Sequence, residues 1–346
     1  MKNKNIILLI TFIVCISCSK ESQKNELSNN KKGFFIVNEG NFTWGNSSLS
    51  FYDEINSTID NDIFFKANQV PLGDVAFDMK IINNKGFISI NNSGIIYVIN
   101  PENSKHIKTI SGFISPRYIL PINDSIAYVS DLYSPYITII HTEKLQKHGT
   151  IFIGSSTESM VKVNNKVFVT SWSFKQKVYV INTITHNTID SIIVGKQPQS
   201  IVVDKNDKIW ILCDGGYQGN PIGHEAPSLW KINTLSHQVE NVIIFPSLNY
   251  MARSLSINQN KDSLTFIYHH IYRISVNDTI FPNNYWLASN NKNYYTVWHH
   301  PKKPWLIISD AKNYVSRGSV LIYSTSKQLL NEIETGIIPS AFCYKE

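Results

Sequence analysis

Aromatic, amide and arginine side chains recur in the polar segments that separate the apolar runs of this 346-residue chain. Asn41 to Trp44 contains an amide and two rings, and Trp172 and Phe174 stand in a similar segment. Flat rings and amides suit a large, partly planar, polar ligand, because rings stack on planar groups while amides both donate and accept hydrogen bonds. The predicted ligand-binding residues are Asn41, Phe42, Trp44, Arg117, Tyr133, Trp172, Phe174, Tyr217, His224, Tyr250, Arg253 and Tyr314.

Residue patterns typical of catalysis are missing from the sequence. It contains no glycine-rich phosphate loop, HExxH, paired CxxC or GxSxG motif. Adjacent histidines at 269–270 and 299–300 would point to opposite sides of a strand and make poor metal sites. His224 and Glu225 could form an acid–base pair, but nothing in the sequence fixes their geometry. We therefore expect a protein that is not an enzyme, with no catalytic residue, no metal and no catalytic cofactor.

The elements that position these side chains come from an internal repeat. An apolar alternating strand, a polar loop and a second strand recur seven times, with first strands beginning near residues 34, 86, 126, 167, 208, 264 and 305. Four of the six spacings are 40 or 41 residues, and the longest contains an insertion at 214–227. A period of about 40–45 residues built from short strands is typical of a β-propeller with four-stranded blades. The sequence thus predicts an all-β, seven-bladed β-propeller over residues 33–346, as a single domain.

The C-terminus is expected to close the ring. The segment at 335–345, TGIIPSAFCYK, parallels VGKQPQSIVVD at 194–204, which precedes a blade elsewhere. The first blade has no room upstream for an innermost strand of its own. We therefore expect residues 338–345 to pair beside 34–38, which removes open sheet edges.

The strands of such a blade, named A to D from the axis to the rim, sort the polar segments onto two faces. The B–C loops and the D–A connections emerge together on what we call the loop face, and the A–B and C–D turns emerge on the turn face. All of the predicted binding residues fall on the loop face, and rigidly supported loops commonly bind ligands. Its D–A connections contribute Arg117, Gln197, Gln199, Tyr250, Arg253, Tyr294 and Tyr295.

The N-terminus has the features of an export signal. A basic start precedes a mostly apolar run from Ile6 to Ile16, which is too short to span a bilayer as a helix. The ending Cys15-Ile16-Ser17-Cys18 resembles a lipobox, so we expect a signal peptide over 1–17 and a lipidated Cys18. Residues 18–32 are then a flexible tether. These features predict an outer-membrane lipoprotein exposed at the cell surface and held to the membrane by its lipid.

Composition excludes several classes of protein. Apolar residues make up 42% of the chain and charged residues 17%, which excludes a disordered chain and a coiled coil. The net charge is +6, and the lysines are scattered rather than clustered, so we expect no nucleic-acid partner. Cys213 and Cys343 lie in apolar strand-like runs and are expected to be buried free thiols. The folded propeller is expected to be monomeric.

Four segments carry a resemblance to a known family. They are VNEGNFTWGNSSLSFYD (37–53), SPRYILPI (115–122), VYVINT…IDSIIVGKQPQSIVVD (178–204) and TGIIPSAFCY (335–344). Together they resemble the YncE-type, surface-layer-like seven-bladed propeller lipoproteins of Bacteroidetes. Within that group, BtuG-type proteins capture cobalamin and pass it to a TonB-dependent outer-membrane transporter.

The resemblance implies a surface lipoprotein that captures a small-molecule nutrient, with a corrinoid as candidate ligand and a TonB-dependent transporter as candidate partner. No residue set in this chain separates corrinoid binders from propellers with other ligands. Two further functions stay open: a structural or protein-docking propeller without a small ligand, and a propeller lyase or quinoprotein-like enzyme subunit.

Overall fold

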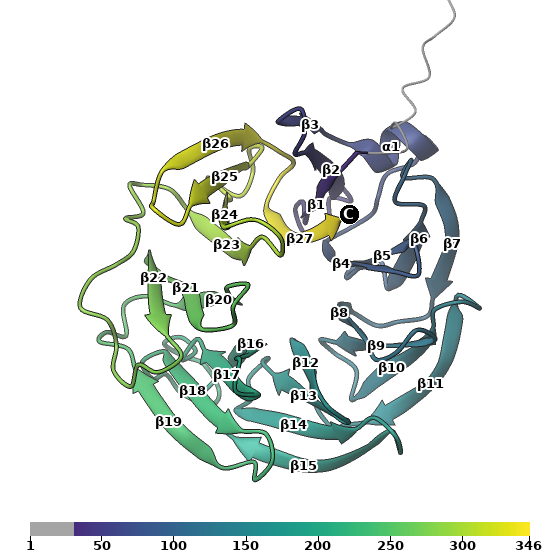
Figure 1. Ribbon diagram of the computed structural model, residues 1–346. Coiled ribbons are helices and arrows are strands. Elements are labelled where there is room, and N and C mark those ends of the chain that lie inside the picture. Colours follow the sequence, from purple (N-terminus) through teal and green to yellow (C-terminus); the bar gives the residue numbers. More distant parts are fainter. Residues whose placement is uncertain (1–30) are drawn as a thin grey trace, which may run out of the picture.

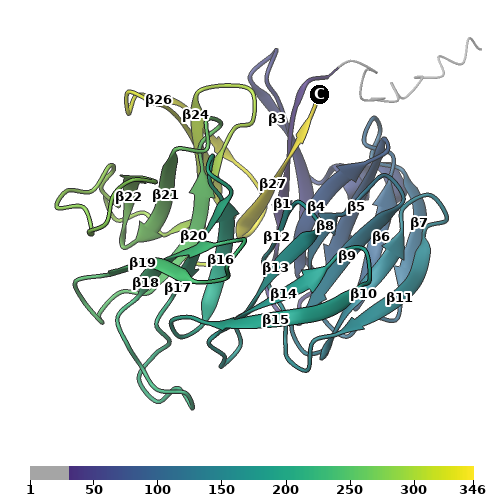
Figure 2. The ribbon, with the colours of Figure 1, turned by 60° about the horizontal axis from the view of Figure 1, so that its bottom comes forward.

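Short runs rich in β-branched and aromatic residues form the strands of this protein, because such side chains pack well on a pleated surface. The computed structural model describes residues 31–346. In that part of the chain the strands form seven antiparallel sheets around a central axis (Figure 1), and the sheets stand side by side as blades (Figure 2). The protein is an all-β, seven-bladed β-propeller, as the repeat predicts.

The first three blades contain the strands of residues 33–152 together with the C-terminal strand β27. Blade 1 contains β1 (Gly33–Asn38), β2 (Ser48–Asp53), β3 (Thr58–Asp60) and β27 (Pro339–Lys345). The short helix α1 (Ile63–Asn68) leads to blade 2, which contains β4 (Ala76–Ile82), β5 (Lys85–Ile90), β6 (Ile95–Ile99) and β7 (His106–Ser111). Blade 3 contains β8 (Pro116–Pro121), β9 (Ile126–Asp131), β10 (Tyr136–His141) and β11 (Gln146–Phe152).

The remaining blades follow in order around the ring. Blade 4 contains β12 (Met160–Val163), β13 (Lys166–Ser171), β14 (Lys177–Asn182) and β15 (Asn187–Ile193). Blade 5 contains β16 (Pro198–Val203), β17 (Lys208–Cys213), β18 (Ser228–Asn233) and β19 (Val239–Ile244). Blade 6 contains β20 (Ala252–Ile257), β21 (Ser263–Tyr268) and β22 (His270–Ser275). Blade 7 contains β23 (Tyr294–His299), β24 (Trp305–Asp310), β25 (Ser319–Ser324) and β26 (Leu329–Glu334).

The C-terminal strand closes the ring. β27 pairs antiparallel with β1, so that Phe35 lies opposite Cys343 and Val37 opposite Ala341. In Figure 1 the yellow β27 lies on the axis side of the purple β1. The predicted pairing of the two chain ends is therefore confirmed. The predicted B strands, now β1, β5, β9, β13, β17, β21 and β24, each begin within one residue of the expected position.

Apolar side chains between neighbouring blades form the core. Seven buried clusters are found, one at each interface between adjacent blades, and the cluster between blades 7 and 1 includes Phe34, Ile307 and Phe342. Cys213 and Cys343 are buried free thiols, as predicted. Each blade thus buries its two faces against its neighbours.

Blade 6 departs from the predicted four strands, since only three are found in its sheet. The segment after β22 contains Pro282 and several asparagines, which favour turns over a long strand. Phe281 in this segment packs on Phe245 and Tyr272, with ring centroids 4.7 and 4.8 Å apart. An irregular loop thereby covers the blade in place of the outer strand.

The N-terminal predictions concern residues that the structure does not describe. The signal peptide over 1–17, the lipidation site Cys18 and the tether as far as residue 30 lie outside the described residues. Within residues 31–346, no helix has the length and hydropathy needed to cross a membrane.

Candidate functional site

One side chain from each of the seven blades reaches the central axis at the loop face. Each stands two residues before a buried apolar residue of its innermost strand, such as Met79 in β4 or Ile119 in β8. These seven side chains line one cavity of about 420 Å³. We call them the axial ring; its members are Phe77, Arg117, Glu158, Gln199, Arg253, Tyr295 and Ser340.

Irregular strand pairing turns these side chains toward the axis. In β4, Ala76 and Asp78 lie opposite consecutive residues of β5, so that Phe77 is an extra, bulged residue. Shifts of register occur at the corresponding place in β8, β16, β20, β23 and β27. Bulges bend a strand and redirect a side chain, and they are common beside binding sites.

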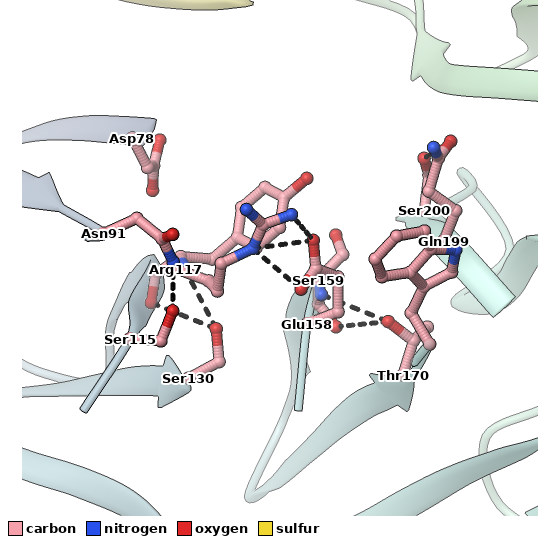
Figure 3. Close-up of polar contacts among 12 residues, drawn as sticks. Asp78, Asn91, Ser115, Arg117, Ser130, Glu158, Ser159, Thr170, Gln199 and Ser200 are labelled. Carbon is pink, nitrogen blue, oxygen red and sulfur yellow. Dashed lines mark hydrogen bonds and ion pairs between the residues drawn. The ribbon is translucent and has the colours of Figure 1, made fainter. Parts of the chain in front are cut away.

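Hydroxyl groups of the second strands satisfy the backbone where the ladder is interrupted. The Asp78 N–H donates to Ser89 Oγ at 3.1 Å, and the Tyr118 N–H donates to Ser130 Oγ at 3.0 Å. The Ser159 N–H likewise donates to Thr170 Oγ1 at 3.1 Å (Figure 3). Hydroxyl groups thus replace ladder hydrogen bonds at these three places.

A rigid ion pair forms one side of the cavity. The Arg117 guanidinium donates to Glu158 through Nε at 3.0 and 3.1 Å and through Nη2 at 2.5 Å (Figure 3). Its carbon Cζ lies 3.4 Å from the ring centroid of Phe77. The ion pair is mostly buried, with Arg117 13% and Glu158 2% exposed. A guanidinium stacked on a ring and bound by a carboxylate fork has little freedom to move.

Arg253 provides the other cation of the axial ring, and it is without a carboxylate partner within 4.0 Å among the described residues. Its guanidinium lies over the Tyr295 ring, 5.3 Å from the centroid. The Tyr295 hydroxyl donates to the Glu39 carboxylate at 3.1 and 3.2 Å. Burial raises the pKa of Glu39 from its ordinary 4.5 to about 7, although Arg117, Tyr295 and Arg253 oppose the shift. Arg253 is therefore free to bind an acceptor or anion from a ligand.

Trp172 adds a flat apolar wall at the edge of the cavity. Its indole N–H donates to Asp214 Oδ2 at 2.6 Å, and the amide of Gln197 reaches the same oxygen at 3.3 Å. Burial raises the pKa of Asp214 to about 6, although these hydrogen bonds favour the ionised form. Asp214 thus orients the ring, which leaves its faces available for packing.

The arrangement can bind and orient a molecule. The cavity combines rings, hydroxyls, an amide and a free guanidinium. The hydroxyls of Ser340 and Tyr295 stand beside the Glu39 carboxyl in its wall. In that same part of the chain, no group of three or more His, Cys, Asp or Glu side chains is placed to hold a metal ion.

Three of the twelve predicted binding residues, Arg117, Trp172 and Arg253, line this cavity. Asn41 lies on the loop face and donates to the Tyr314 carbonyl at 2.6 Å, so it connects two loops. The others are exposed and are not among the residues that line the cavity; we call them the loop-face rim: Phe42, Trp44, Tyr133, Phe174, Tyr217, His224, Tyr250 and Tyr314. Tyr250 stacks on His269 with ring centroids 4.5 Å apart.

Sequence reasoning did not single out Glu39, Phe77, Glu158 or Ser340. Each is one residue in a strand or strand end of ordinary composition, so its type carries no signal alone. Alignment of the repeats on their innermost strands would have found Phe77, Glu158 and Ser340. These three occupy the same position of the repeat as Arg117, Gln199, Arg253 and Tyr295. Glu39 follows a B strand and has no such signal.

Known proteins resemble this chain in fold and in family. Residues 32–328 match the sequence family described as Domain of unknown function (DUF5074). No curated protein matches the sequence. A quinoprotein alcohol dehydrogenase-like protein from Bacteroides thetaiotaomicron is similar in structure, with a TM-score of 0.70, 14% identity, and 91% of this chain and 78% of that chain covered.

Two more distant propellers show how widely the fold is shared. The hydrazine synthase of Kuenenia stuttgartiensis has a TM-score of 0.61 at 14% identity, covering 78% of this chain and 89% of that one. The Cps50 (Swd1) propeller domain of Myceliophteria thermophila has a TM-score of 0.62 at 7% identity, covering 80% and 90%. Identities this low support the fold alone. The family match covers most of the chain, and the protein therefore belongs to the DUF5074 family.

Proposed function

We propose that this protein is a binding propeller that holds a small polar molecule, with a planar apolar part, in the loop-face cavity without turning it over. The observation that carries the proposal is the axial ring, in which seven blades supply side chains of six different types to a single cavity. A volume of about 420 Å³ lies in the ordinary range of small-molecule sites. Rings of Phe77 and Trp172 can pack on a planar group while Arg253 binds a carboxylate or carbonyl oxygen.

In this proposal the protein is a cell-surface lipoprotein that captures a nutrient for a TonB-dependent outer-membrane transporter. Support comes from the lipobox-like N-terminus and from the resemblance to YncE-type propellers. A corrinoid is the first ligand to test, since it is planar and its rim carries amides. Such a molecule is larger than the cavity, so part of it would lie over the mouth against the loop-face rim.

The loop-face rim favours a second role for the same face, the docking of a protein. Phe42, Trp44 and Tyr133 are 66%, 75% and 69% exposed, which is unusual for large rings unless they meet a partner. Aromatic residues are enriched at protein interfaces. A transporter that covers the rim would close the cavity over its ligand.

Calorimetric titration of soluble residues 19–346 with cyanocobalamin tests the proposal. We expect saturable one-to-one binding that Arg253→Gln weakens and that Arg317→Gln leaves unchanged. Arg317 is the matched control, because it is 40% exposed and pairs with Asp62 and Glu334 away from the cavity. Binding that Arg253→Gln does not affect would place the ligand outside the cavity. Absence of heat from a folded sample would exclude a corrinoid as the ligand. If native mass spectrometry also detected no bound small molecule, the proposed binding function would be excluded.

A further inference from the structure

A pair of residues in blade 6 departs from the apolar pattern that five of the seven blades keep. In the second and third strands of each blade, one cross-strand pair faces the neighbouring blade. In five blades this pair is apolar: Phe35–Phe51, Phe87–Val98, Tyr128–Ile139, Phe168–Val180 and Ile307–Ile322. In blade 5 it is Trp210–Lys231. In blade 6 the same pair is Thr265–Arg273. The fold therefore does not require a polar group here, and the substitution calls for a reason.

Arg273 is a half-buried cation that forms no ion pair among the described residues. Its Nε and Nη2 atoms are inaccessible to solvent and have no hydrogen-bond partner among the described residues. The guanidinium lies over the Trp286 ring, whose centroid is 4.3 Å from Cζ. Burial lowers the pKa of the guanidinium. Because an isolated buried charge is costly, a guanidinium in this state is poised to bind an anion.

A cavity of about 190 Å³ opens beside Arg273 at the turn face, between blades 6 and 7. Its lining includes Gln259, Asn260, His299 and Lys303, and no carboxylate is among the described residues that line it. Burial and the neighbouring Arg273 lower the pKa of His299 to about 3, so this imidazole is neutral. The side chains of Gln259 and Asn260 are exposed at the entrance and can donate from their amides.

Two other basic side chains that line this cavity, Lys303 and His300, already have a partner. Lys303 Nζ lies 2.6 Å from Glu54 Oε2, and His300 Nε2 lies 2.6 Å from Glu54 Oε1. Glu54 is thereby occupied, and Arg273 is the cation that the cavity leaves uncompensated. Lys231, at the corresponding position in blade 5, offers a contrast. It lies between blades 5 and 6 and donates to the Val276 carbonyl at 3.1 Å.

We propose that the cavity beside Arg273 is a second binding site, distinct from the loop-face cavity, for an oxyanion group such as a phosphate or sulfate. The guanidinium carries five donors in one plane, two of which can bind two oxygens of one oxyanion. Trp286 holds the guanidinium plane from one side, and the amides of Gln259 and Asn260 are placed to complete the contacts. The Thr265 hydroxyl is engaged with His299 Nε2 at 2.9 Å, which fixes the wall of the site.

The oxyanion can be a free ion or the charged end of a larger molecule. A second cavity of about 500 Å³ adjoins the first and shares Ser263 and Arg273 with it. Its lining includes Asp262 and Asp278, which suit the hydroxyl groups of a larger ligand rather than a second anion. Inorganic phosphate and glucose 6-phosphate therefore distinguish the two sources.

Thermal unfolding of the soluble protein, measured at constant ionic strength against chloride, tests this site. We expect inorganic phosphate to raise the melting temperature in a saturable way, as a ligand that binds only the folded state does. Arg273→Met should fold, because apolar residues fill this position in other blades, and should lose the saturable shift. Arg273→Lys keeps the charge without the planar set of donors and should weaken phosphate binding at least about tenfold. Tighter binding of glucose 6-phosphate than of phosphate would indicate a larger ligand, and equal binding a free ion.

The control variant is Arg317→Gln, which removes an exposed arginine at another blade junction. Phosphate and sulfate also stabilise proteins in general through exclusion from the surface, and this effect is equal in all variants. The same phosphate response in wild type and Arg273→Met would overturn the proposal. A wild-type protein with no saturable response to phosphate, sulfate or glucose 6-phosphate would overturn it as well.

Discussion

Ionisation of Glu39 should make the stability of this propeller fall as the pH rises toward neutrality. The carboxyl stands at the end of β1, in the wall of the loop-face cavity, where it accepts a hydrogen bond from Tyr295. Burial raises its pKa from 4.5 to about 7. The folded protein therefore keeps a proton on Glu39 over a pH range in which the unfolded chain has lost it.

The sign and size follow from proton linkage. A pKa that is higher in the folded state gives stability that is fully present below pH 4.5 and is lost as the pH rises through about 7. A pKa difference of this size corresponds to a fall of up to about 3 kcal/mol in the free energy of unfolding. For a folded unit of roughly 315 residues the unfolding entropy is about 0.7 kcal/mol per kelvin, so the melting temperature should fall by up to about 5 °C.

Substitution of Glu39 by glutamine isolates this effect, since the amide imitates the protonated carboxyl at every pH. We expect Glu39→Gln to match wild type near pH 4.5 and to be more stable by up to about 3 kcal/mol at pH 8. Denaturant titrations from pH 4.5 to 8 on both proteins measure the difference. Glu240→Gln is the control, because hydrogen bonds from Lys208 lower the pKa of this exposed carboxyl. Parallel pH profiles for wild type and Glu39→Gln would refute the reasoning.

Three further predictions concern the axial ring and the closure of the propeller. Arg117→Met or Glu158→Gln alone should each destabilise the protein by about 3 kcal/mol, since each leaves a buried charge without its partner. The double variant should lose less free energy of unfolding than the sum of the two single variants. A double-mutant cycle measured by denaturant titration that shows no coupling between the two residues would contradict this. Gly336→Ala should destabilise by about 1–3 kcal/mol, because a Cβ there would meet Asn38 Cγ at 2.6 Å, and an unchanged melting temperature would count against that contact. Deletion of residues 339–346 removes β27 and should expose β1 and abolish the cooperative thermal transition; a retained transition would show that closure is dispensable.

The fold could be predicted from the sequence because a repeat multiplies weak signals. One short apolar run is ambiguous, but seven runs at nearly constant spacing fix the B strands to within one residue. The loss of the outer strand in blade 6 was not predictable in this way. The segment 276–293 has strand-forming residues such as Ile280 and Phe281, and only tertiary packing shows that Phe281 covers the blade as part of a loop.

The candidate site was predicted in part. Arg117, Trp172 and Arg253 stand out in sequence because large or charged residues are conspicuous where strands begin and end. The exposed rings of the loop-face rim stand out for the same reason, yet they are not among the residues that line the cavity. The direction of the side chain distinguishes the residues that line the cavity from those of the loop-face rim. That direction depends on β-bulges, which the residue type alone does not predict.

The repeat itself supplies the strongest argument about function. In each innermost strand the buried position stays apolar around the whole ring, as the core demands: Met79, Ile119, Met160, Ile201, Leu255, Val297 and Phe342. Two residues earlier, the axial ring takes a phenylalanine, two arginines, a glutamate, a glutamine, a tyrosine and a serine. Packing needs one kind of residue at equivalent places, whereas a binding site for one asymmetric molecule needs different ones. The same reasoning applies to Arg273, which stands where five blades have an apolar residue and which, unlike Lys231 of blade 5, leaves two guanidinium nitrogens without a hydrogen-bond partner among the described residues. Departure from the repeat, rather than residue type alone, therefore marks both proposed sites.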